Sequence, residues 1–560
     1  MLEETRICQN CKQEFVIEPE DFAFYEKIKV PAPTFCPKCR MERRMIWRNE
    51  RVLYKAICGL CGVSMISMYD PKNTFKVYCE KCWWGDAWDP IDYGFSYDFD
   101  QPFFLQWQKL LKQTPLVHLW KFNNVDCDYI NYATDDKNCY LSASILGCEN
   151  IFYSYAIDKS QDSLDSLFSN KISRCYENID SVNNYNSIFL QNCSNCINSA
   201  FLFDCVNCQE CFFSSNLRNK KYFFKNVQYS KSEYDLKISE IKTGSYSILL
   251  KTLSEFQEFK KNSIHRYIQA INEINCSGNN VSNSKNVKHS FNVYNAENIK
   301  YTARATDDKD CMDLFGAVYT ELAYESVAPS FQGSNAQFSI SNRNSHNIKY
   351  SLLCNSSHDI FGCIGLKDKQ YCVFNKQYTK KEYEALVLKI IGYMKENKEY
   401  GEFFPKELSP FAYNETVAQD YFPLTKDIAI SKAYAWKDYD PKSYNITKKS
   451  EDLPDSIEDS PDSVLNEIIQ CAHNQQCNEQ CTKAFKIVKE ELNFYKKMKL
   501  PLPRLCPNCR HYQRLAQCNP MKLWHRKCMK EGCYNEFETS YAPDRPEIVY
   551  CESFIICKRR

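Results

Sequence analysis

The sequence contains no apolar stretch of about 18 residues, so no segment is expected to span a membrane. Its first residues, MLEETRICQNC, lack the basic segment and apolar run of a secretion signal. It has no P-loop, no GxGxxG after a strand, no HExxH and no GxSxG. There are eight histidines, and we expect His118, His265 and His346 to be surface or hydrogen-bonded core residues rather than bases. These absences predict a cytoplasmic protein and favour a non-enzymatic role.

The chain also lacks a large excess of either positive or negative charge. The formal net charge is +1, so the whole chain has no strong electrostatic preference for nucleic acid or membrane. Acidic residues are concentrated locally, in 84–100 and in 451–467. We expect the first segment to be a solvated loop anchored by aromatic residues rather than a carboxylate site, and the second to belong to a flexible linker.

Cysteine, by contrast, is abundant. The chain has 32 cysteines, and without a secretion signal paired cysteines are more often metal ligands than disulfides. Two CxxC pairs joined by a small hairpin supply the tetrahedral thiolate set of a structural zinc site. The first hundred residues hold two such sets, namely Cys8, Cys11, Cys36 and Cys39, then Cys58, Cys61, Cys79 and Cys82.

The C-terminal end repeats this pattern at an offset of 470 residues, where FYEKIKVPAPTFCPKCR matches FYKKMKLPLPRLCPNCR. The third predicted set is Cys477, Cys481, Cys506 and Cys509. A fourth, degenerate set comprises Cys528, Cys533 and Cys551, with Cys557 as fourth thiolate and Cys518 or His525 as alternatives. The sequence therefore predicts three structural Zn²⁺ sites, and a fourth if its last ligand is supplied.

Both ends resemble a known family. The arrangement C-x2-C, a nearby Phe, FY, a proline-rich turn and CPxCRxxRR is similar to the zinc-ribbon family of small bacterial proteins, over about residues 5–45 and 475–515. The resemblance implies zinc binding and a bacterial origin, and it brings no activity with it. The whole layout also resembles large uncharacterised bacterial zinc-ribbon proteins.

Between these ends runs a twelve-residue repeat. Its anchor positions are mostly Asn or Asp, and they are Asp126, Asn138, Asn150, Asp162, Arg174, Asn186, Asn198 and Glu210. A second copy follows, because LRNKKYFFKNVQYSKSEY (217–234) matches LKDKQYCVFNKQYTKKEY (366–383) at an offset of 149. Short strands separated by Asn-containing turns predict a β-solenoid, in which Asn tolerates left-handed backbone and stacks between rungs. The alternative is an ordinary antiparallel sheet.

The length of one coil follows less directly. Twelve residues would enclose only small side chains, so the many Phe and Tyr residues favour two half-turns and a coil of about 24 residues. Among the inner cysteines Cys193, Cys196, Cys205, Cys208 and Cys211, the first and third are twelve residues apart, as are the second and fourth. We interpret them as a ladder of small buried residues, with a further metal site as the alternative.

The predicted fold is mainly β, a duplicated solenoid-like repeat with helical inserts, flanked by zinc ribbons. Apolar periodicity predicts helices over 246–274 and 380–400. The domains are ribbon 1 (1–50), ribbon 2 with the acidic aromatic loop (51–100), repeat copy 1 (101–234), a helical insert (235–274), repeat copy 2 (275–383), a mixed helical segment (384–448), an acidic linker (449–470), ribbon 3 (471–516) and ribbon 4 (517–560).

These features favour a structural-zinc scaffold. Basic residues beside the ribbons point to a nucleic-acid or ribonucleoprotein partner, because they can neutralise phosphates. They are Arg40, Arg43, Arg44, Arg48, Arg510, Arg514, Arg526 and Lys527. The alternatives are a scaffold for proteins alone, with these arginines paired to local carboxylates, and a β-helix enzyme acting on a carbohydrate.

Overall fold

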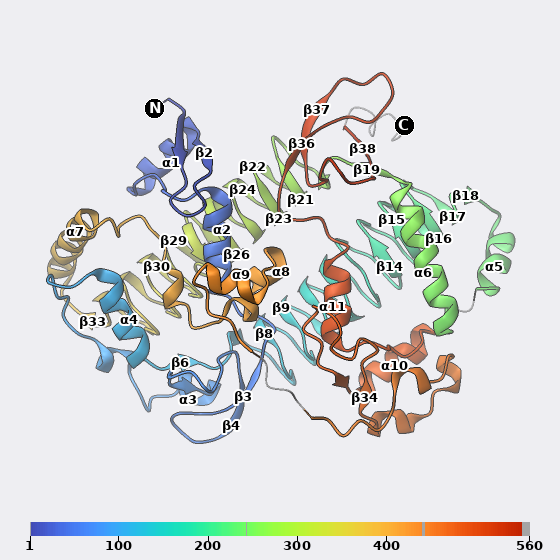
Figure 1. Ribbon diagram of the computed structural model, residues 1–560, viewed down its shortest axis with the longest axis horizontal. Coiled ribbons are helices and arrows are strands. Elements are labelled where there is room, and N and C mark those ends of the chain that lie inside the picture. Colours follow the sequence, from blue (N-terminus) through green and yellow to red (C-terminus); the bar gives the residue numbers. More distant parts are fainter. Residues whose placement is uncertain (1, 242, 439–442, 552–560) are drawn as a thin grey trace. The chain divides into compact units, whose positions relative to one another are not determined.

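The computed structural model describes residues 2–241, 243–438 and 443–551. The chain forms two compact units, each built from two distant segments. Unit 1 is Met1–Trp120 with Ile268–Asp438, and unit 2 is Lys121–Tyr267 with Tyr439–Arg560. The first two ribbons therefore belong with repeat copy 2, and the last two ribbons belong with repeat copy 1 (Figure 1).

Repeat copy 1 is a parallel β-solenoid, as predicted. Asn131 pairs with Ala143, Ala143 with Tyr155, and Tyr155 with Leu167, always twelve residues on. One coil is therefore twelve residues long, and the prediction of about 24 is wrong. The strands are β7 (Lys121–Phe122), β8 (Asn131–Thr134), β9 (Ala143–Leu146), β10 (Glu149–Phe152), β11 (Tyr155–Asp158), β12 (Gln161–Leu164), β13 (Leu167–Asn170), β14 (Ile188–Gln191), β15 (Ala200–Phe203), β16 (Gln209–Ser215) and β17 (Lys221–Phe224).

The short coil is possible because the backbone turns at every third residue. Asn186, Phe189, Asn192 and Asn195 have φ of 47°, 56°, 55° and 54°, and this left-handed spacing continues along the solenoid. Each coil is thus four short sides with one inward residue per side, mostly Ser, Cys, Ala, Ile or Leu. Most of the large aromatic side chains point outward, some at corners, such as Phe189, and others between corners, such as Phe152 and Phe212. The premise that twelve residues enclose only small side chains was correct, but the aromatic residues were assigned to the wrong side.

Two hydrogen-bond ladders join the coils. Inside, Ser142 Oγ donates to the carbonyl of Tyr140 at 3.0 Å and accepts from the backbone N–H of Ser154 at 3.1 Å. At the corners, Asn138 Nδ2 donates to Asn150 Oδ1 at 2.6 Å. The predicted stacking of asparagines, and the left-handed backbone at all eight anchor positions, are both confirmed.

Repeat copy 2 has the same architecture. Most of its coils are also twelve residues long, but Ala270 pairs with Val281, eleven residues on, and Val327 pairs with Ile340, thirteen residues on. Its strands are β20 (Ala270–Ile271), β21 (Gly278–Ser282), β22 (Lys285–Lys288), β23 (Ser290–Tyr294), β24 (Glu297–Lys300), β25 (Ala303–Thr306), β26 (Lys309–Val318), β27 (Thr320–Glu321), β28 (Tyr324–Val327), β29 (Gly333–Gln337), β30 (His346–Lys349), β31 (His358–Phe361) and β32 (Gln370–Val373).

Each solenoid ends in a hairpin and a helix. In unit 2, β18 (Val227–Gln228) folds back on β17 and leads into α5 (Lys231–Ser239). In unit 1, β33 (Lys376–Gln377) folds back on β32 and leads into α7 (Lys380–Glu396). Both helices start with a capping box, and the two hairpins cover the last parallel strand, whose backbone would otherwise be an open edge.

Two predictions for the connecting segments need correction. The helix α6 (Tyr246–Lys261) stops well before residue 274, and β19 (Ile264–Arg266) and β20 follow it, because the repeat pattern resumes there. The acidic segment 449–470 is not a free linker. It forms the short helices η4 (Ser450–Asp452), η5 (Ile457–Asp459) and η6 (Asp462–Asn466), and its Leu453, Ile457 and Val464 are buried in one core with ribbon 3.

The remaining predicted features have structural roles. Asp89 in the acidic aromatic loop caps η1 (Pro90–Tyr93) and forms an ion pair with Lys369 at 3.0 Å. His265 is buried, with Nδ1 3.0 Å from the Tyr541 hydroxyl and Nε2 2.9 Å from the Lys260 carbonyl. Among the described residues, no helix combines the length and apolarity needed to cross a membrane.

Candidate metal centres

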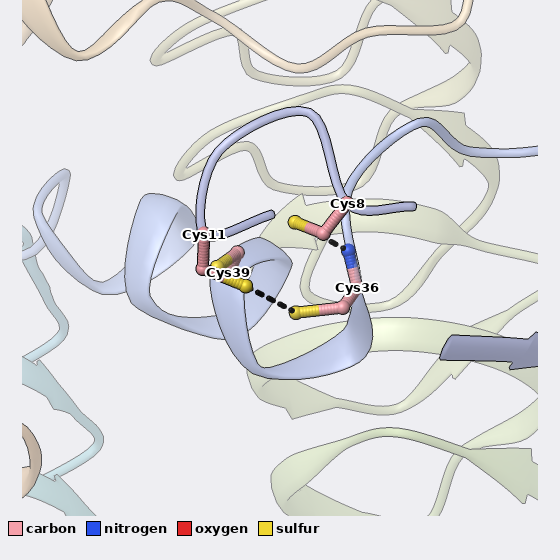
Figure 2. Close-up of side chains that lie close together, drawn as sticks. All are labelled: Cys8, Cys11, Cys36 and Cys39. Atoms are coloured by element: carbon pink, nitrogen blue, oxygen red, sulfur yellow. Dashed lines mark hydrogen bonds between the residues drawn. The ribbon is translucent and has the colours of Figure 1, made fainter. Parts of the chain in front are cut away.

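Ribbon 1 brings its four predicted cysteines together. The hairpin of β1 (Glu4–Ile7) and β2 (Glu14–Ile17) carries Cys8 and Cys11 in its turn. After α1 (Pro19–Ile28), the helix α2 (Pro37–Met45) starts at Cys36, which is its N-cap, and Cys39 lies in its first turn. Figure 2 shows the four side chains converging on one point.

The geometry fits a tetrahedral metal ion. All four Sγ atoms lie within 4.8 Å of one another, and Cys11 Sγ is 3.8 Å from Cys36 Sγ. Bonds of ~2.3 Å to a tetrahedral ion place two sulfurs ~3.8 Å apart. The backbone N–H of Cys36 also donates to Cys8 Sγ at 3.3 Å (Figure 2), which favours a charged sulfur ligand.

The electrostatics of the set call for a cation. Burial alone raises the pKa of Cys8, but N–H groups such as that of Cys36 outweigh it and lower the pKa to about 6. The shared hydrogen bond with Cys36, together with burial, raises the pKa of Cys39. Because four adjacent thiols cannot all ionise unaided, a bound cation is what would deprotonate the whole set.

Ribbon 2 repeats this arrangement with the predicted residues. Cys58, Cys61, Cys79 and Cys82 form a second set within 4.8 Å, with Cys61 Sγ 3.8 Å from Cys79 Sγ. They are held by β3 (Tyr54–Ile57), β4 (Ser64–Ser67), β5 (Val77–Tyr78) and α3 (Glu80–Trp84).

Ribbon 3 corrects the predicted set by one residue. The cysteines that converge are Cys471, Cys481, Cys506 and Cys509. The backbone N–H of Cys506 donates to Cys471 Sγ at 3.2 Å, as Cys36 does to Cys8, so Cys471 rather than Cys477 matches Cys8. The sequence did not reveal this, because nine residues separate Cys471 from Cys481 where a CxxC pair has two. The supporting elements are β34 (Ile469–Gln470), β35 (Ala484–Phe485), α10 (Lys489–Met498) and α11 (Pro507–Leu515).

Ribbon 4 brings three predicted cysteines together. Cys528, Cys533 and Cys551 form a set within 4.8 Å, next to β36 (Trp524–Lys527), β37 (Glu536–Thr539) and β38 (Ile548–Tyr550). Cys557 lies outside the described residues. Neither alternative ligand joins this set, because His525 pairs with Glu536 at 2.8 Å and Cys518 Sγ lies 3.8 Å from the Arg514 carbonyl.

The inner cysteines of repeat copy 1 form a ladder. Cys193 Sγ donates to the Gln191 carbonyl at 3.3 Å, and Cys205 Sγ donates to the Phe203 carbonyl at 3.4 Å, as the inward serines do. Burial raises the pKa of both thiols well above the usual value. These cysteines form none of the ligand sets found among the described residues, which favours the ladder interpretation.

The ribbon arginines face the solenoid. In unit 1, Arg40 and Arg44 of α2, which lies beside β26 in Figure 1, are 2.8 and 3.1 Å from the two oxygens of Asp313. Arg43 pairs with Glu325 at 2.5 Å. Arg48 pairs with Glu50, and both side chains are buried. The predicted local partners were therefore only partly correct, since Glu50 is used but the main carboxylates come from the solenoid.

Unit 2 contains the same arrangement. Arg510 and Arg514 of α11 both bind Asp165, and Arg514 Nη1 donates to Asp165 Oδ1 at 2.8 Å and to Glu177 Oε1 at 3.0 Å. We call each arrangement of ribbon arginines on solenoid carboxylates an arginine clamp. Six of the eight residues predicted for nucleic acid are thus in buried or nearly buried ion pairs. The other two differ, since Arg526 is half-buried and Lys527 is exposed beside Glu536.

Unit 2 also contains a cavity of about 350 Å³ beside its clamp. Its walls include Phe189 of the solenoid, Leu249 and Phe256 of α6, and Gln513 and Gln517 at the end of the ribbon. Lys260 also lines it, with Nζ 2.7 Å from Gln191 Oε1, and burial lowers the pKa of this lysine to about 8.

Comparison with known proteins adds no family to this description. No protein-family model and no curated protein matches the chain.

Proposed function

We propose that the chain is a structural-zinc scaffold, in which metal-stabilised ribbons hold two β-solenoids as fixed surfaces for protein partners. The four-thiolate sets support zinc because they offer closed tetrahedral coordination by soft ligands and leave no position for a catalytic water. Zinc therefore acts here on the fold rather than on a reaction.

The observation that carries this proposal is the coupling of ligand and clamp in one helix. Cys36 is the N-cap of α2, and Arg40 and Arg44 follow it on the face that meets Asp313. Cys506 is likewise the N-cap of α11, which carries Arg510 and Arg514. An ion that fixes the start of each helix also fixes where its guanidinium groups enter the solenoid.

Metal removal tests the proposal. A strong zinc chelator is expected to release zinc from the full chain and to make α2 and α11 sensitive to protease, because in such small units metal binding and folding are coupled. Cys36→Ser should lose one ion per chain. Cys193→Ser is the matched control and should lose none, since serine already occupies equivalent ladder positions such as Ser181. Iron in place of zinc, an absence of metal, or metal loss in the control would contradict the proposal.

Two other functions have weaker support. Nucleic-acid binding would have to rely on groups such as Arg526 and Lys527, because the clamp arginines are committed to carboxylates. Salt-insensitive or absent retention of RNA and DNA by the full chain would agree with a protein-only scaffold. A carbohydrate enzyme would need free carboxylates in a cleft, but Glu177 of the cavity is paired with Arg514.

A further inference from the structure

The segment between the first two cysteines of ribbon 3 is longer than in ribbons 1 and 2, and it contains ligand residues of its own. The nine residues between Cys471 and Cys481 include His473, Cys477 and Glu479. The loop returns these three side chains to Cys509, which already belongs to the four-cysteine set. Cys509 is the only residue that the two sets share.

The ligand atoms of this loop are arranged for a cation. One atom from each of His473, Cys477, Glu479 and Cys509 lies within 4.8 Å of all the others. Cys477 Sγ is 3.8 Å from Cys509 Sγ, the same separation as Cys471 Sγ from Cys509 Sγ in the first set. The sulfurs of Cys477 in the loop and Cys509 in α11 thus have the spacing that a tetrahedral ion imposes.

The histidine and the glutamate add independent evidence. His473 Nδ1 and Glu479 Oε2 are 2.9 Å apart and both atoms are buried, and apart from this contact neither has a hydrogen-bond partner among the described residues. A buried pair of this kind with no further hydrogen bonds is costly, and a cation bound by both side chains would satisfy them. An ordinary surface ion pair would leave such atoms exposed to water.

We propose that ribbon 3 binds two divalent ions, the second held by His473, Cys477, Glu479 and a bridging Cys509 thiolate. This inference rests on the proposed metal binding of the ribbons. A mixed nitrogen, oxygen and sulfur set suits Zn²⁺ and excludes the oxygen-seeking ions Mg²⁺ and Ca²⁺. Cys477, predicted from the sequence as a ligand of the first ion, instead belongs to the second.

Metal content of the full chain, purified with Zn²⁺, tests the site. His473→Ala combined with Glu479→Gln is expected to lose one ion per chain while α11 stays protected from protease, and Cys477→Ser should behave in the same way. Asn478→Ala, an exposed position of the same loop, is the control and should keep every ion. Because Cys509 serves both ions, Cys509→Ser should lose two, whereas Cys36→Ser in ribbon 1 loses one.

The contrary results are distinct. Unchanged zinc in the His473 and Glu479 double variant would reduce that pair to a surface contact and overturn the second ion. Loss of protease protection in Cys477→Ser, with no effect of the double variant, would return Cys477 to the first ion and also overturn it. If Cys36→Ser and the wild type both lack zinc, the proposed function itself fails.

Discussion

The two arginine clamps share a centre of two arginines on one aspartate, and they differ in the glutamate contact, since Glu325 pairs with Arg43 and Glu177 pairs with Arg514. Arg40 and Arg44 have counterparts 470 residues on in Arg510 and Arg514, whereas the carboxylates Asp165 and Glu177 recur 148 residues on as Asp313 and Glu325. Aromatic residues follow the same rule, since Tyr153 lies under Arg510 and Tyr301 under Arg40. Equivalent ribbon and solenoid residues therefore meet in both units, although the ribbons precede the solenoid in unit 1 and follow it in unit 2.

What surrounds the clamps is different. In unit 1, Glu402 pairs with Arg43 at 2.9 Å, and Phe404 packs on Trp47 with ring centroids 5.3 Å apart. In unit 2 the counterparts of Arg43 and Trp47 are Gln513 and Gln517, and both line the cavity. The clamp is therefore independent of its covering, which identifies it as the common structural element of the two units.

The largest expected effect comes from the clamp carboxylates. Asp313→Ala and Asp165→Ala should each destabilise their own unit by about 3–5 kcal/mol, because two buried guanidinium groups lose their partner. Hydrogen exchange of α2 and α11 would locate the loss. Asp307→Asn is the control, because the side-chain oxygen of asparagine can still accept the hydrogen bond from Asn295 Nδ2. Tolerance of either Asp→Ala change would break the equivalence of the two clamps.

A smaller effect comes from the buried aspartates, which lie at different positions of the two solenoid interiors: Asp136 in unit 2 and Asp308 in unit 1. Asp136 points inward in unit 2 where unit 1 has Ser284, and its Oδ1 accepts from the Cys148 N–H at 2.8 Å as Ser284 Oγ accepts from the Ala296 N–H. Burial raises the pKa of Asp136 to about 8 from 3.8. Between those values the folded chain holds a proton that the unfolded chain releases, so the free energy of unfolding falls as pH rises.

Asp136→Asn should remove that slope and raise the free energy of unfolding at neutral pH by about 1–3 kcal/mol, because a neutral amide is buried without the uptake of a proton that the carboxyl needs. Denaturant midpoints measured below and above the window would show it. In the reverse direction, Ser284→Asp should steepen the pH slope that the buried Asp308 already gives to unit 1. Parallel pH profiles for Asp136→Asn and wild type would contradict the assignment.

The smallest effect concerns the corners. Asn298 has φ of 57° and donates to Asp310 Oδ1 at 2.7 Å. Asn298→Ala should lower the free energy of unfolding by about 1–2 kcal/mol, because alanine is strained in the left-handed backbone conformation and cannot donate the hydrogen bond to Asp310. Asn298→Gly should lower the free energy of unfolding by less, since glycine adopts the left-handed conformation without strain. Thermal unfolding would rank the two, and an alanine variant as stable as the glycine variant would remove the backbone explanation. The same pair at Asn150 extends the test to unit 2.

Local features of the sequence predicted much of this molecule. Pairs such as Cys58 and Cys61, and corner residues such as Asn138, have their structural meaning within a few neighbours or one repeat. The three-residue spacing of the corners was harder to see, because Phe189 and Tyr153 also adopt the left-handed backbone and no residue type marks every corner.

Long-range features were not predictable in the same way. Cys471 takes its place through a loop of unusual length, and its role depends on which backbone N–H it accepts. The clamp joins Arg510 to Asp165 across more than three hundred residues, so the basic run beside each ribbon resembled a solvent-exposed surface. Only the packing of helix on solenoid shows that these charges are internal.

The thirteen-residue coil between Val327 and Ile340 explains why two spacings relate the copies. Asp165 and Asp313, which precede it, are 148 residues apart, whereas Phe189 and Phe338 are 149 apart. Both phenylalanines nevertheless stack on the aromatic ring of the next coil, Phe201 and Tyr350. The side of the solenoid that a residue faces depends on its position within a coil. One coil can therefore contain an extra residue at a turn while the residues of later coils still face the same sides as their counterparts.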